Sequence, residues 1–312
     1  MTRFAIALTA LIALAAPASA QRAEGPFTIE KSGRSYARLA DAVAAIGDGA
    51  GTIRIAPGTY SDCAVQDGGI IAYVAAEPGT AIFDGGICED KATLVLHGRG
   101  ARVDGLVFQN LQVADGNGAG IRIETGNLEV ANSLFRNSEE GILSADDAAS
   151  SISVTRSTFS RLGRCDRGLS CAHSIYIGDY GSLNVTQSRF EKGNGGHYVK
   201  SRSRRTVVTD STFDDTAGRA TNYMIDLPEG STGAITGNLF IQGRDKENYS
   251  AFIAVAAEDR TYSSAGLKID DNVAAIAPGV TRSTIFIANW SKDKLAIGDN
   301  RLGDGLTLYE KR

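Results

Sequence analysis

The sequence predicts an all-β fold in which short strands stack along one axis as a solenoid. The first observation is a pattern that recurs eight times at steps of 23 to 34 residues. It is an aliphatic residue followed, in most copies, by a small or polar residue three positions later and by phenylalanine two positions after that. Repeats of this length are typical of solenoids. The second observation is that the copies alternate or are β-branched and end at Ser, Asn or Gly, as strands do. No helical segment separates the copies, which excludes a βαβ fold.

The repeat contains two columns of equivalent side chains. The aliphatic column is Val103, Val130, Val154, Val185, Val208, Ile235, Ile269 and Ile297. The aromatic column is Phe108, Phe135, Phe159, Phe190, Phe213 and Phe240, continued by Ala274 and Leu302. Parallel strands on successive turns lie about 4.8 Å apart. Residues one repeat apart are therefore predicted to be direct neighbours.

A helix is predicted over residues 35–46, before the first strands. Its apolar face consists of Tyr36, Leu39, Ala42, Val43 and Ile46. Ser35 is the expected N-cap, and Gly47 and Gly49 end the helix. We expect this helix to cover the first apolar turn of the solenoid, because terminal repeats need a cap. Strands then begin at residues 52–60.

From about residue 119, a second column of strand segments precedes each copy of the repeat. The expected inward aliphatic residues are Ile121, Ile142, Ile175, Val199, Ile225, Ile253 and Ile285. Side chains alternate across a strand. The next residue in each segment should therefore point outward, and these residues are Arg122, Leu143, Tyr176, Lys200, Asp226, Ala254 and Phe286.

This organisation resembles the right-handed parallel β-helix proteins of the pectate-lyase-like superfamily, and in particular secreted bacterial β-helix repeat proteins. The resemblance extends over residues 27–300. It is carried by LADAVAAIGDGAGTIRIAPGTY near the start and then by DGNGAGIR, NSEEGIL, CAHSIYIG, GHYVKSR and YMIDLPEGS. It implies a single-stranded right-handed parallel β-helix, which we expect to form one domain over residues 21–312.

Residues 1–20 are typical of a secretory signal peptide. Arg3 precedes an apolar stretch, and Ala-Ser-Ala at 18–20 forms a small-residue cleavage site. No later segment is apolar enough to span a bilayer. We therefore predict an exported protein, periplasmic or extracellular.

The four cysteines fit an oxidising compartment. Cys63 and Cys88 are 25 residues apart, about one repeat, and should lie on neighbouring turns. Cys165 and Cys171 are six residues apart in a loop-like stretch. We predict these two pairs as disulfides, although the sequence leaves the other two connectivities open.

The net charge of −4 argues against a general nucleic-acid role. The exception to this acidity is KSRSRR at residues 200–205, which places four cations in six residues. Such a run suggests attraction for an anionic ligand. We expect a monomer with an acidic polysaccharide as its partner.

Three successive turns should bring polar side chains together on the outward face of the second strand column. One row is His173, His197 and Tyr223, with Glu140 one turn before it. The other row is Tyr176, Lys200 and Asp226, with Arg202 two positions after Lys200 on the same face. Imidazoles, phenols, an amine, a guanidinium and carboxylates would then share one patch.

This patch has two interpretations. One is an ordinary solvated face, with Lys200 and Asp226 forming a surface ion pair of little energetic importance. The other is a functional site, which we favour because neighbouring outward positions, such as Leu143 and Ala254, are uncharged.

The functional interpretation predicts β-elimination from a uronate-containing polysaccharide. This reaction needs a cation for the sugar carboxylate, a base for the C5 proton and an acid for the leaving oxygen. Arg202 suits the carboxylate. Lys200, His173 or His197 is the candidate base, since imidazole titrates near neutrality. Tyr176 or Tyr223 is the candidate acid.

We assign Tyr223, Asp226, Glu140 and Arg122 to substrate binding. β-helix lyases, such as the family of alginate lyases and chondroitinase B, often use Lys and Arg. In that family the two residues lie on different turns. Here they are two positions apart on one strand, which departs from the family pattern.

Two alternatives remain open. A glycoside hydrolase on the same fold would need two carboxylates flanking the bond, about 5–9 Å apart. Asp226 with Glu140 or Glu229 would supply them. A non-catalytic carbohydrate-binding or envelope protein is the second alternative.

We expect no cofactor. Calcium is the one metal considered, because many pectate-lyase-like enzymes use it and Ca²⁺ needs several converging oxygen ligands. Asp115, Asn117 and Glu124 are the candidate ligands, although Asp-Gly-Asn-Gly is also an ordinary turn sequence.

Overall fold

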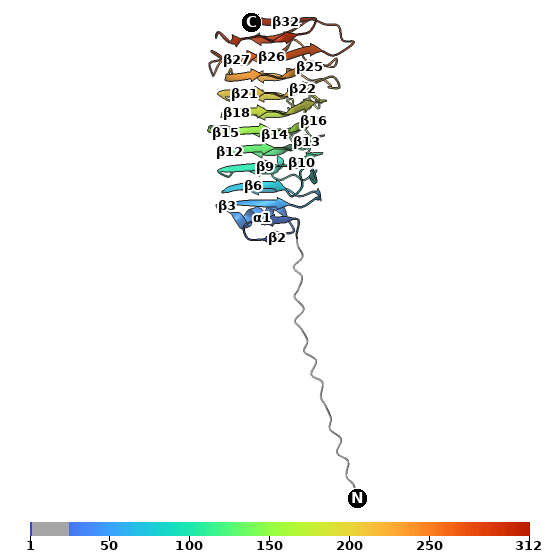
Figure 1. Cartoon of the computed structure of the whole chain (residues 1–312), viewed down its shortest axis with the longest axis vertical. Coiled ribbons are helices and arrows are strands. Elements are labelled where there is room, and N and C mark those ends of the chain that lie inside the picture. The colour runs from blue at the N-terminus through green and yellow to red at the C-terminus, as the bar shows by residue number, and fades with distance from the viewer. Residues whose placement is uncertain (2–24) are drawn as a thin grey trace.

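The computed structural model describes Met1 and residues 25–312, so the signal peptide predicted over residues 1–20 lies, apart from Met1, outside the described residues. The chain forms one solenoid in which strands of three parallel sheets follow one another in turn (Figure 1). We call them sheets A, B and C. Each circuit passes from A to B to C and then rises to the next turn, and the predicted stacking of strands as a parallel solenoid is confirmed. Within the described residues, no helix is long and apolar enough to cross a bilayer.

Each sheet is a single stack of strands in which neighbours are hydrogen-bonded. Sheet A contains, in spatial order, β2 (Arg34–Tyr36), β1 (Phe27–Ile29), β3 (Ala50–Ile55), β6 (Ile70–Ala75), β9 (Gly100–Asp104), β12 (Asn127–Ala131), β15 (Asp147–Thr155), β18 (Tyr180–Thr186), β21 (Arg205–Thr209), β24 (Thr232–Thr236), β27 (Lys268–Asp270) and β30 (Ala296–Ile297). Sheet B contains β4 (Gly58–Tyr60), β7 (Ala81–Asp84), β10 (Leu106–Gln109), β13 (Leu134–Arg136), β16 (Thr158–Ser160), β19 (Arg189–Glu191), β22 (Thr212–Asp214), β25 (Leu239–Gln242), β28 (Val273–Ile276) and β31 (Arg301–Leu302). Sheet C contains β5 (Ala64–Gln66), β8 (Ala92–Leu96), β11 (Ala119–Ile123), β14 (Glu140–Ser144), β17 (Ile175–Ile177), β20 (Val199–Ser201), β23 (Ile225–Leu227), β26 (Ala251–Val255), β29 (Thr284–Asn289) and β32 (Leu306–Lys311).

Both predicted columns of the repeat are confirmed as continuous rows. The aliphatic residues from Val103 to Ile297 pair in register on successive strands of sheet A. The aromatic residues pair in register in sheet B, and the rings from Phe108 to Phe240 stack at 4.8–5.0 Å. Burial of these side chains forms the core that holds the turns together.

The polar position of the repeat lies at the corner between sheets A and B. There, the side-chain oxygen of each residue accepts a hydrogen bond from the backbone N–H of its counterpart one turn earlier, as in Ser157 to Ser133 and Asn238 to Ser211. These corner groups are buried. The ladder therefore satisfies backbone donors that would otherwise be unpaired.

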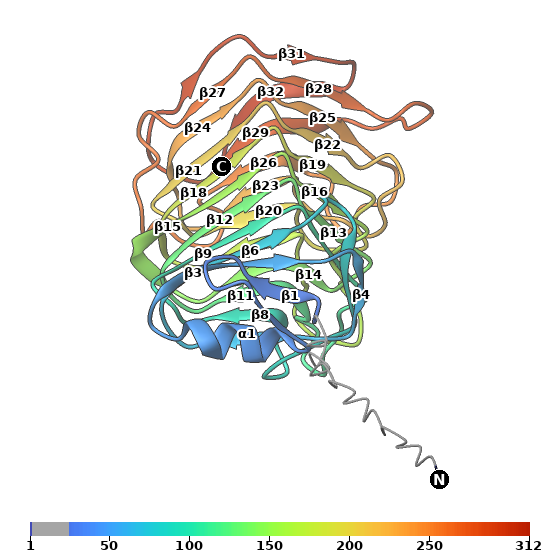
Figure 2. The ribbon, with the colours of Figure 1, turned by 60° about the horizontal axis from the view of Figure 1, so that its bottom comes forward.

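Helix α1 (Leu39–Ile46) is shorter than predicted. Ser35 is not its N-cap, because Ser35 and Tyr36 belong to β2, which pairs antiparallel with β1. Arg38 takes the N-cap position, and the Leu39 N–H is instead satisfied by the Asp62 carboxylate at 2.9 Å. The helix lies at the N-terminal end of the solenoid (Figure 2), where Leu39, Ala42 and Val43 are buried.

The predicted outward row is wrong at its last member. Ile253 pairs with Ile287, so the row continues from Ala254 to Ala288 and does not include Phe286. Phe286 is fully buried and packs edge-on against Phe240 and Phe252. The reason is that Phe286 lies at the corner before the inward isoleucine, where the side chain points into the core.

Both predicted disulfides are confirmed. Cys63 joins Cys88 just before the paired strands β5 and β8, and Cys165 joins Cys171 within the loop between β16 and β17. The first connects neighbouring turns of the solenoid, and the second closes a short loop beside sheet C.

Candidate functional site

The predicted polar rows lie on the outward face of β17, β20 and β23, in the middle of sheet C. Tyr176 pairs with Lys200, and Lys200 pairs with Asp226, on successive strands. The expected vertical register of these three residues is therefore present. Arg122 is in the same column, but Leu143 separates it from Tyr176.

The second row is a stack of rings at the entry to the same strands. The ring centroids of His173 and His197 are 4.9 Å apart, and those of His197 and Tyr223 are 5.5 Å apart. The His197 backbone N–H donates to His173 Nδ1 at 3.0 Å. Since Nδ1 accepts, neutral His173 carries its proton on Nε2. Below the stack, Glu140 accepts a bond from the His173 backbone N–H at 3.3 Å.

Lys200 is held by two carboxylates. Its Nζ is 2.5 Å from Glu258 Oε1 and 3.5 Å from Asp226 Oδ2. His197 Nε2 lies 3.4 Å from the same Asp226 oxygen. Lys200 is 8% exposed and Asp226 is 2% exposed. The pair is therefore buried, and its interpretation as an ordinary surface ion pair is wrong.

Arg202 lies between Tyr176 and the carboxylate of Glu258 that also binds Lys200. Its Nε donates to the Tyr176 hydroxyl at 3.0 Å, and its terminal nitrogens donate to Glu229, at 2.5 Å, and to Glu258. The guanidinium carbon also lies 5.8 Å from the centre of the Tyr176 ring, and Lys200 Nζ lies 5.6 Å from it. The phenol thus has two cations beside it, one of them bonded to its oxygen. Tyr176 and Arg202 remain partly exposed.

Sequence reasoning missed the role of Glu258. It belongs to the segment between β26 and β27, whose backbone turns at Ala256 with φ 56°. The Glu258 and Asp259 N–H groups both donate to the Pro228 carbonyl, which holds this segment over Lys200. The one available signal was the step of 34 residues between Ile235 and Ile269, the longest in the repeat, which indicates an insertion in that turn.

Burial shifts the protonation of this cluster. Desolvation, assisted by the charge of Lys200, lowers the pKa of His197 to about 3, and desolvation also holds the pKa of His173 well below its usual value. The expectation that these imidazoles titrate near neutrality is therefore wrong: both are neutral at pH 7. Desolvation raises the pKa of Asp226 to about 6, even though Lys200 acts to lower it, and raises that of Glu140 well above its usual value.

Three buried polar atoms of this cluster have no hydrogen-bond partner in the described part of the protein. They are Glu140 Oε2, His197 Nδ1 and Asp226 Oδ1. A buried polar group without a partner is destabilising, and native proteins have few of them. Their concentration in one cluster supports a role for these residues beyond packing.

The candidate calcium ligands are engaged in other contacts. The Asp115 carboxylate accepts the Asn117 N–H within its own turn, and Glu124 pairs with Arg122 and Lys91 at 3.0 Å each. Among residues 25–312, no group of three or more His, Cys, Asp or Glu side chains is arranged to hold a metal ion. Arg122 therefore belongs to this separate ion-pair group and not to the cluster around Lys200.

Comparisons with known proteins agree with the architecture. The family model described as "Right handed beta helix region" matches residues 94–290. A solved structure of ORF18 from Geobacillus virus E2 is 12% identical with a TM-score of 0.52, and the match covers 87% of this chain and 57% of that one. This chain therefore spans little more than half the length of the viral protein, and the likeness shows the fold alone. The Streptococcus pneumoniae surface protein and adhesin PfbA is 12% identical with a TM-score of 0.36, over 88% of this chain and 94% of that one. No curated protein matches the sequence.

Proposed function

We propose a function for this chain from the premise that it belongs to the right-handed β-helix family. It is an exported lyase that cleaves a uronate-containing polysaccharide by β-elimination on the outward face of sheet C. The observation that carries the proposal is the bond from Arg202 Nε to the Tyr176 hydroxyl at 3.0 Å. It places the positive charge of Arg202 on a partly exposed hydroxyl that can carry a proton. The two disulfides are compatible with export.

In the proposed reaction, two partly exposed residues of the cluster, Arg202 and Tyr176, act on the substrate. Arg202 binds the sugar carboxylate, and this neutralisation makes the C5 proton more acidic. Tyr176 acts as the phenolate, its own proton having passed to water, and takes the C5 proton; the electron pair of the C5–H bond forms the C4–C5 double bond, and the C4–O bond breaks. The departing oxygen then takes the proton from Tyr176. Arg202 assists both transfers, because a donor held on the phenol oxygen stabilises negative charge there.

The remaining residues support Tyr176 and Arg202. Lys200 has two carboxylate partners, so its role is to supply positive charge and not to act as the base. His173 stands edge-on to the Tyr176 ring at 5.2 Å and is oriented by the His197 N–H. His197 and Asp226 are buried and lie beside Lys200, and Tyr223 completes the ring stack that borders the substrate.

Glu258 has the same chemistry as the substrate group that this site would recognise. Its carboxylate bridges Lys200 and Arg202, and its side chain is 46% exposed. A uronate carboxylate would displace it and take over the same two cations. Hydrolysis is less favoured, because Asp226 and Glu140 are buried and the partly exposed Glu229 is bound to Arg202.

The test is a panel of uronate polymers, with ultraviolet absorbance of the unsaturated product as the readout. Tyr176→Phe should lower kcat by about 10²–10⁴-fold, and Arg202→Lys should raise KM because it loses the bidentate geometry. Tyr249→Phe changes an exposed tyrosine outside the cluster and serves as the control. New reducing ends without absorbance would indicate a hydrolase. Binding with neither signal would indicate a carbohydrate-binding protein. Full activity of Tyr176→Phe would exclude the proposed mechanism.

A further inference from the structure

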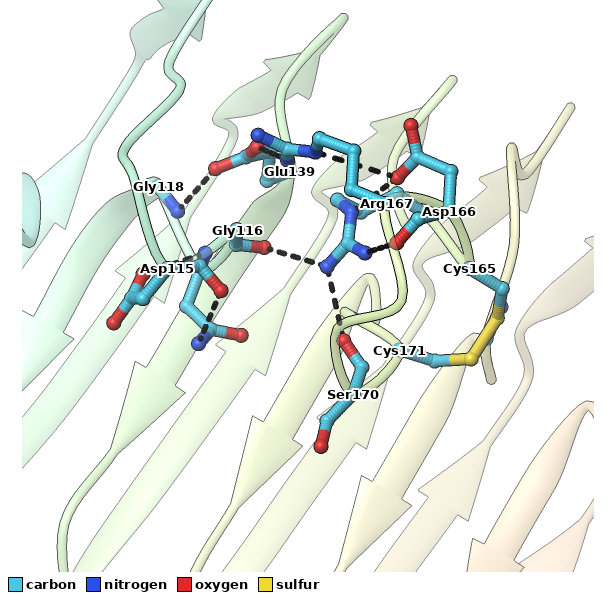
Figure 3. Close-up of polar contacts among 12 residues, drawn as sticks. Asp115, Gly116, Gly118, Glu139, Cys165, Asp166, Arg167, Ser170 and Cys171 are labelled. Atoms are coloured by element: carbon cyan, nitrogen blue, oxygen red, sulfur yellow. Dashed lines mark hydrogen bonds and ion pairs between the residues drawn. A yellow bond between two sulfur atoms is a disulfide. The ribbon is translucent and has the colours of Figure 1, made fainter.

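A cleft lined by cations lies on the turns that lead from sheet B into sheet C. It consists of two adjoining hollows of about 620 and 300 Å³ that share Arg161 and Asn194 as lining residues. The lining of the larger hollow includes Cys165, Asp166 and Arg167. These residues belong to the loop closed by the Cys165–Cys171 disulfide, which Figure 3 shows. This cleft is separate from the cluster around Lys200, which lies on the outward face of the strands that follow.

The smaller hollow has no carboxylate among its described lining residues. Its walls are Arg161, Lys192, Asn194, Ala217 and Arg219. Lys192 pairs with Glu191 at 3.0 Å, whereas Arg161 and Arg219 have no ion-pair partner among residues 25–312. Since the whole protein carries a net charge of −4, this is a local concentration of uncompensated positive charge.

The cations recur from turn to turn along the solenoid axis. Arg161 follows β16, Lys192 follows β19 and Arg219 lies after β22, and these strands pair in order. Arg161 and Lys192 occupy equivalent positions about 4.8 Å apart. Lys192 aligns with Asp215 on the next turn, and Arg219 lies four residues further along that turn, where its backbone N–H donates to the Gly193 carbonyl. A linear polymer that runs parallel to the axis would meet one cation per turn.

The backbone gives a second reason to regard these cations as functional. Arg161 and Lys192 both have left-handed conformations with φ 55°. Asn110 and Asn137 occupy the equivalent positions on earlier turns, with φ 59° and 52°. Asn and Gly adopt this conformation most readily. Arg and Lys offer no conformational advantage there, so what they add is charge.

The larger hollow is polar, and apart from the shared Arg161 its charged side chains are already paired. Arg164 is only 6% exposed and donates to the Ser170 carbonyl and to Asp166 (Figure 3). Arg167 pairs with Glu139, which also accepts the Gly118 N–H. The lining also includes the amide side chains of Gln112 and Asn137. This wall is fixed by its own bonds and offers neutral hydrogen-bonding groups, which suit sugar hydroxyls.

We propose that this cleft binds an anionic saccharide, with acidic groups at Arg161, Lys192 and Arg219 and hydroxyl groups along the larger hollow. No aromatic side chain is among its described lining residues, so nucleobases would find no stacking platform. The turn that carries Asn194 reaches His197 three residues later, so a chain bound here continues onto sheet C. The inference deepens the proposed function and rests on it for the choice of an acidic polysaccharide.

The test measures binding by calorimetry, without relying on turnover. The double variant Arg161→Ala/Arg219→Ala is compared with Lys292→Ala/Arg301→Ala, which removes the same charge from exposed positions outside the cleft. Melting followed by circular dichroism checks that both variants fold. The ligands are uronate oligosaccharides, sulfated oligosaccharides, neutral oligosaccharides of matched length and a single-stranded oligonucleotide.

We expect the double variant to lose roughly tenfold to a hundredfold in affinity for an acidic saccharide. The control pair should lose little, and binding should weaken as ionic strength rises. The uronate and sulfate arms identify which acidic group is bound. Equal losses in the two double variants, equally tight binding of the oligonucleotide, or no saccharide binding would each overturn the inference.

Failure of this inference can be told apart from failure of the proposed lyase activity. If the double variant keeps its affinity while the protein releases unsaturated product, the lyase proposal stands and the cleft proposal falls. If the double variant loses affinity in a protein that forms no product, the cleft proposal stands and the lyase proposal falls.

Discussion

Removing the charge of Glu258 tests whether Lys200 and Arg202 form a site for a substrate carboxylate. Glu258 Oε1 lies 2.5 Å from Lys200 Nζ, and its other oxygen accepts from the Arg202 guanidinium. Glu258→Gln keeps the shape of the side chain and removes the charge that competes with an incoming uronate. We therefore expect the variant to bind acidic polymer more tightly than the wild type.

The expected gain in affinity depends on how exposed the contacts of Glu258 with Lys200 and Arg202 are. A shielded hydrogen bond to a charged group contributes about 1.5–3 kcal/mol, whereas an exposed ion pair contributes about 0–1 kcal/mol. The Glu258 side chain is 46% exposed and that of Lys200 is 10% exposed, so this bridge lies between the two cases. We assign about 1–2 kcal/mol to both contacts together. Loss of this competition should lower KM about 5- to 30-fold.

The assay is steady-state kinetics on the polymer that the screen selects, with kcat expected to stay near its wild-type value. Glu77→Gln is the matched control, because Glu77 is an exposed glutamate on the turn between β6 and β7. A KM that is unchanged or raised would refute the reasoning. In that case, Glu258 would hold the two cations in place for the substrate and would not compete with it.

Three further predictions concern stability and are measured by urea unfolding. Burial raises the pKa of Asp226 to about 6, so the folded protein holds this proton more tightly than the unfolded chain. The difference in free energy of unfolding between the wild type and Asp226→Asn should therefore favour the wild type most below pH 4. This difference should fall by about 2–3 kcal/mol as the pH rises from 4 to 6. A difference that does not change with pH would contradict this prediction. Phe190→Ala removes one ring of the stack and should destabilise by about 3–5 kcal/mol, with Phe190→Leu well below that. Lys246→Met leaves the fully buried Asp215 carboxylate without the cation now 3.1 Å away and should cost about 3–5 kcal/mol. Adding Asp215→Asn should recover part of that loss, and no recovery would argue against the ion pair as its cause.

The repeat was predictable because its contacts are local to one step of the solenoid. A residue of the aliphatic column pairs with its counterparts one turn away, so a regular spacing in the sequence becomes a row of neighbouring side chains in the structure. The same logic correctly placed Tyr176, Lys200 and Asp226 on neighbouring strands, and Cys63 beside Cys88.

The predictions that were wrong or missing concern residues outside the regular repeat. Phe286 has the same strand parity as an outward residue, and only the corner geometry turns it inward. Serine is a common N-cap residue, but Ser35 is part of β2, which pairs antiparallel with β1, and the helix begins later, at Leu39. Glu258 sits on an insertion, and no period predicts which side chain an insertion brings over its neighbours. The burial that lowers the pKa of His197 arises where its ring is stacked between His173 and Tyr223, and it could not be inferred from the residue type.

The stacked phenylalanines also determine how the length of this protein can change. The turns from Phe108 to Phe240 present the same ring above and below, so a whole circuit, such as residues 185–207, could be deleted or duplicated and the new neighbours would still meet ring on ring. Changes in multiples of one circuit preserve the interior, whereas a change of a few residues within a strand would shift every row above it. The molecule is therefore modular along its axis, and variation that spares the core is confined to whole coils or to the outer turns.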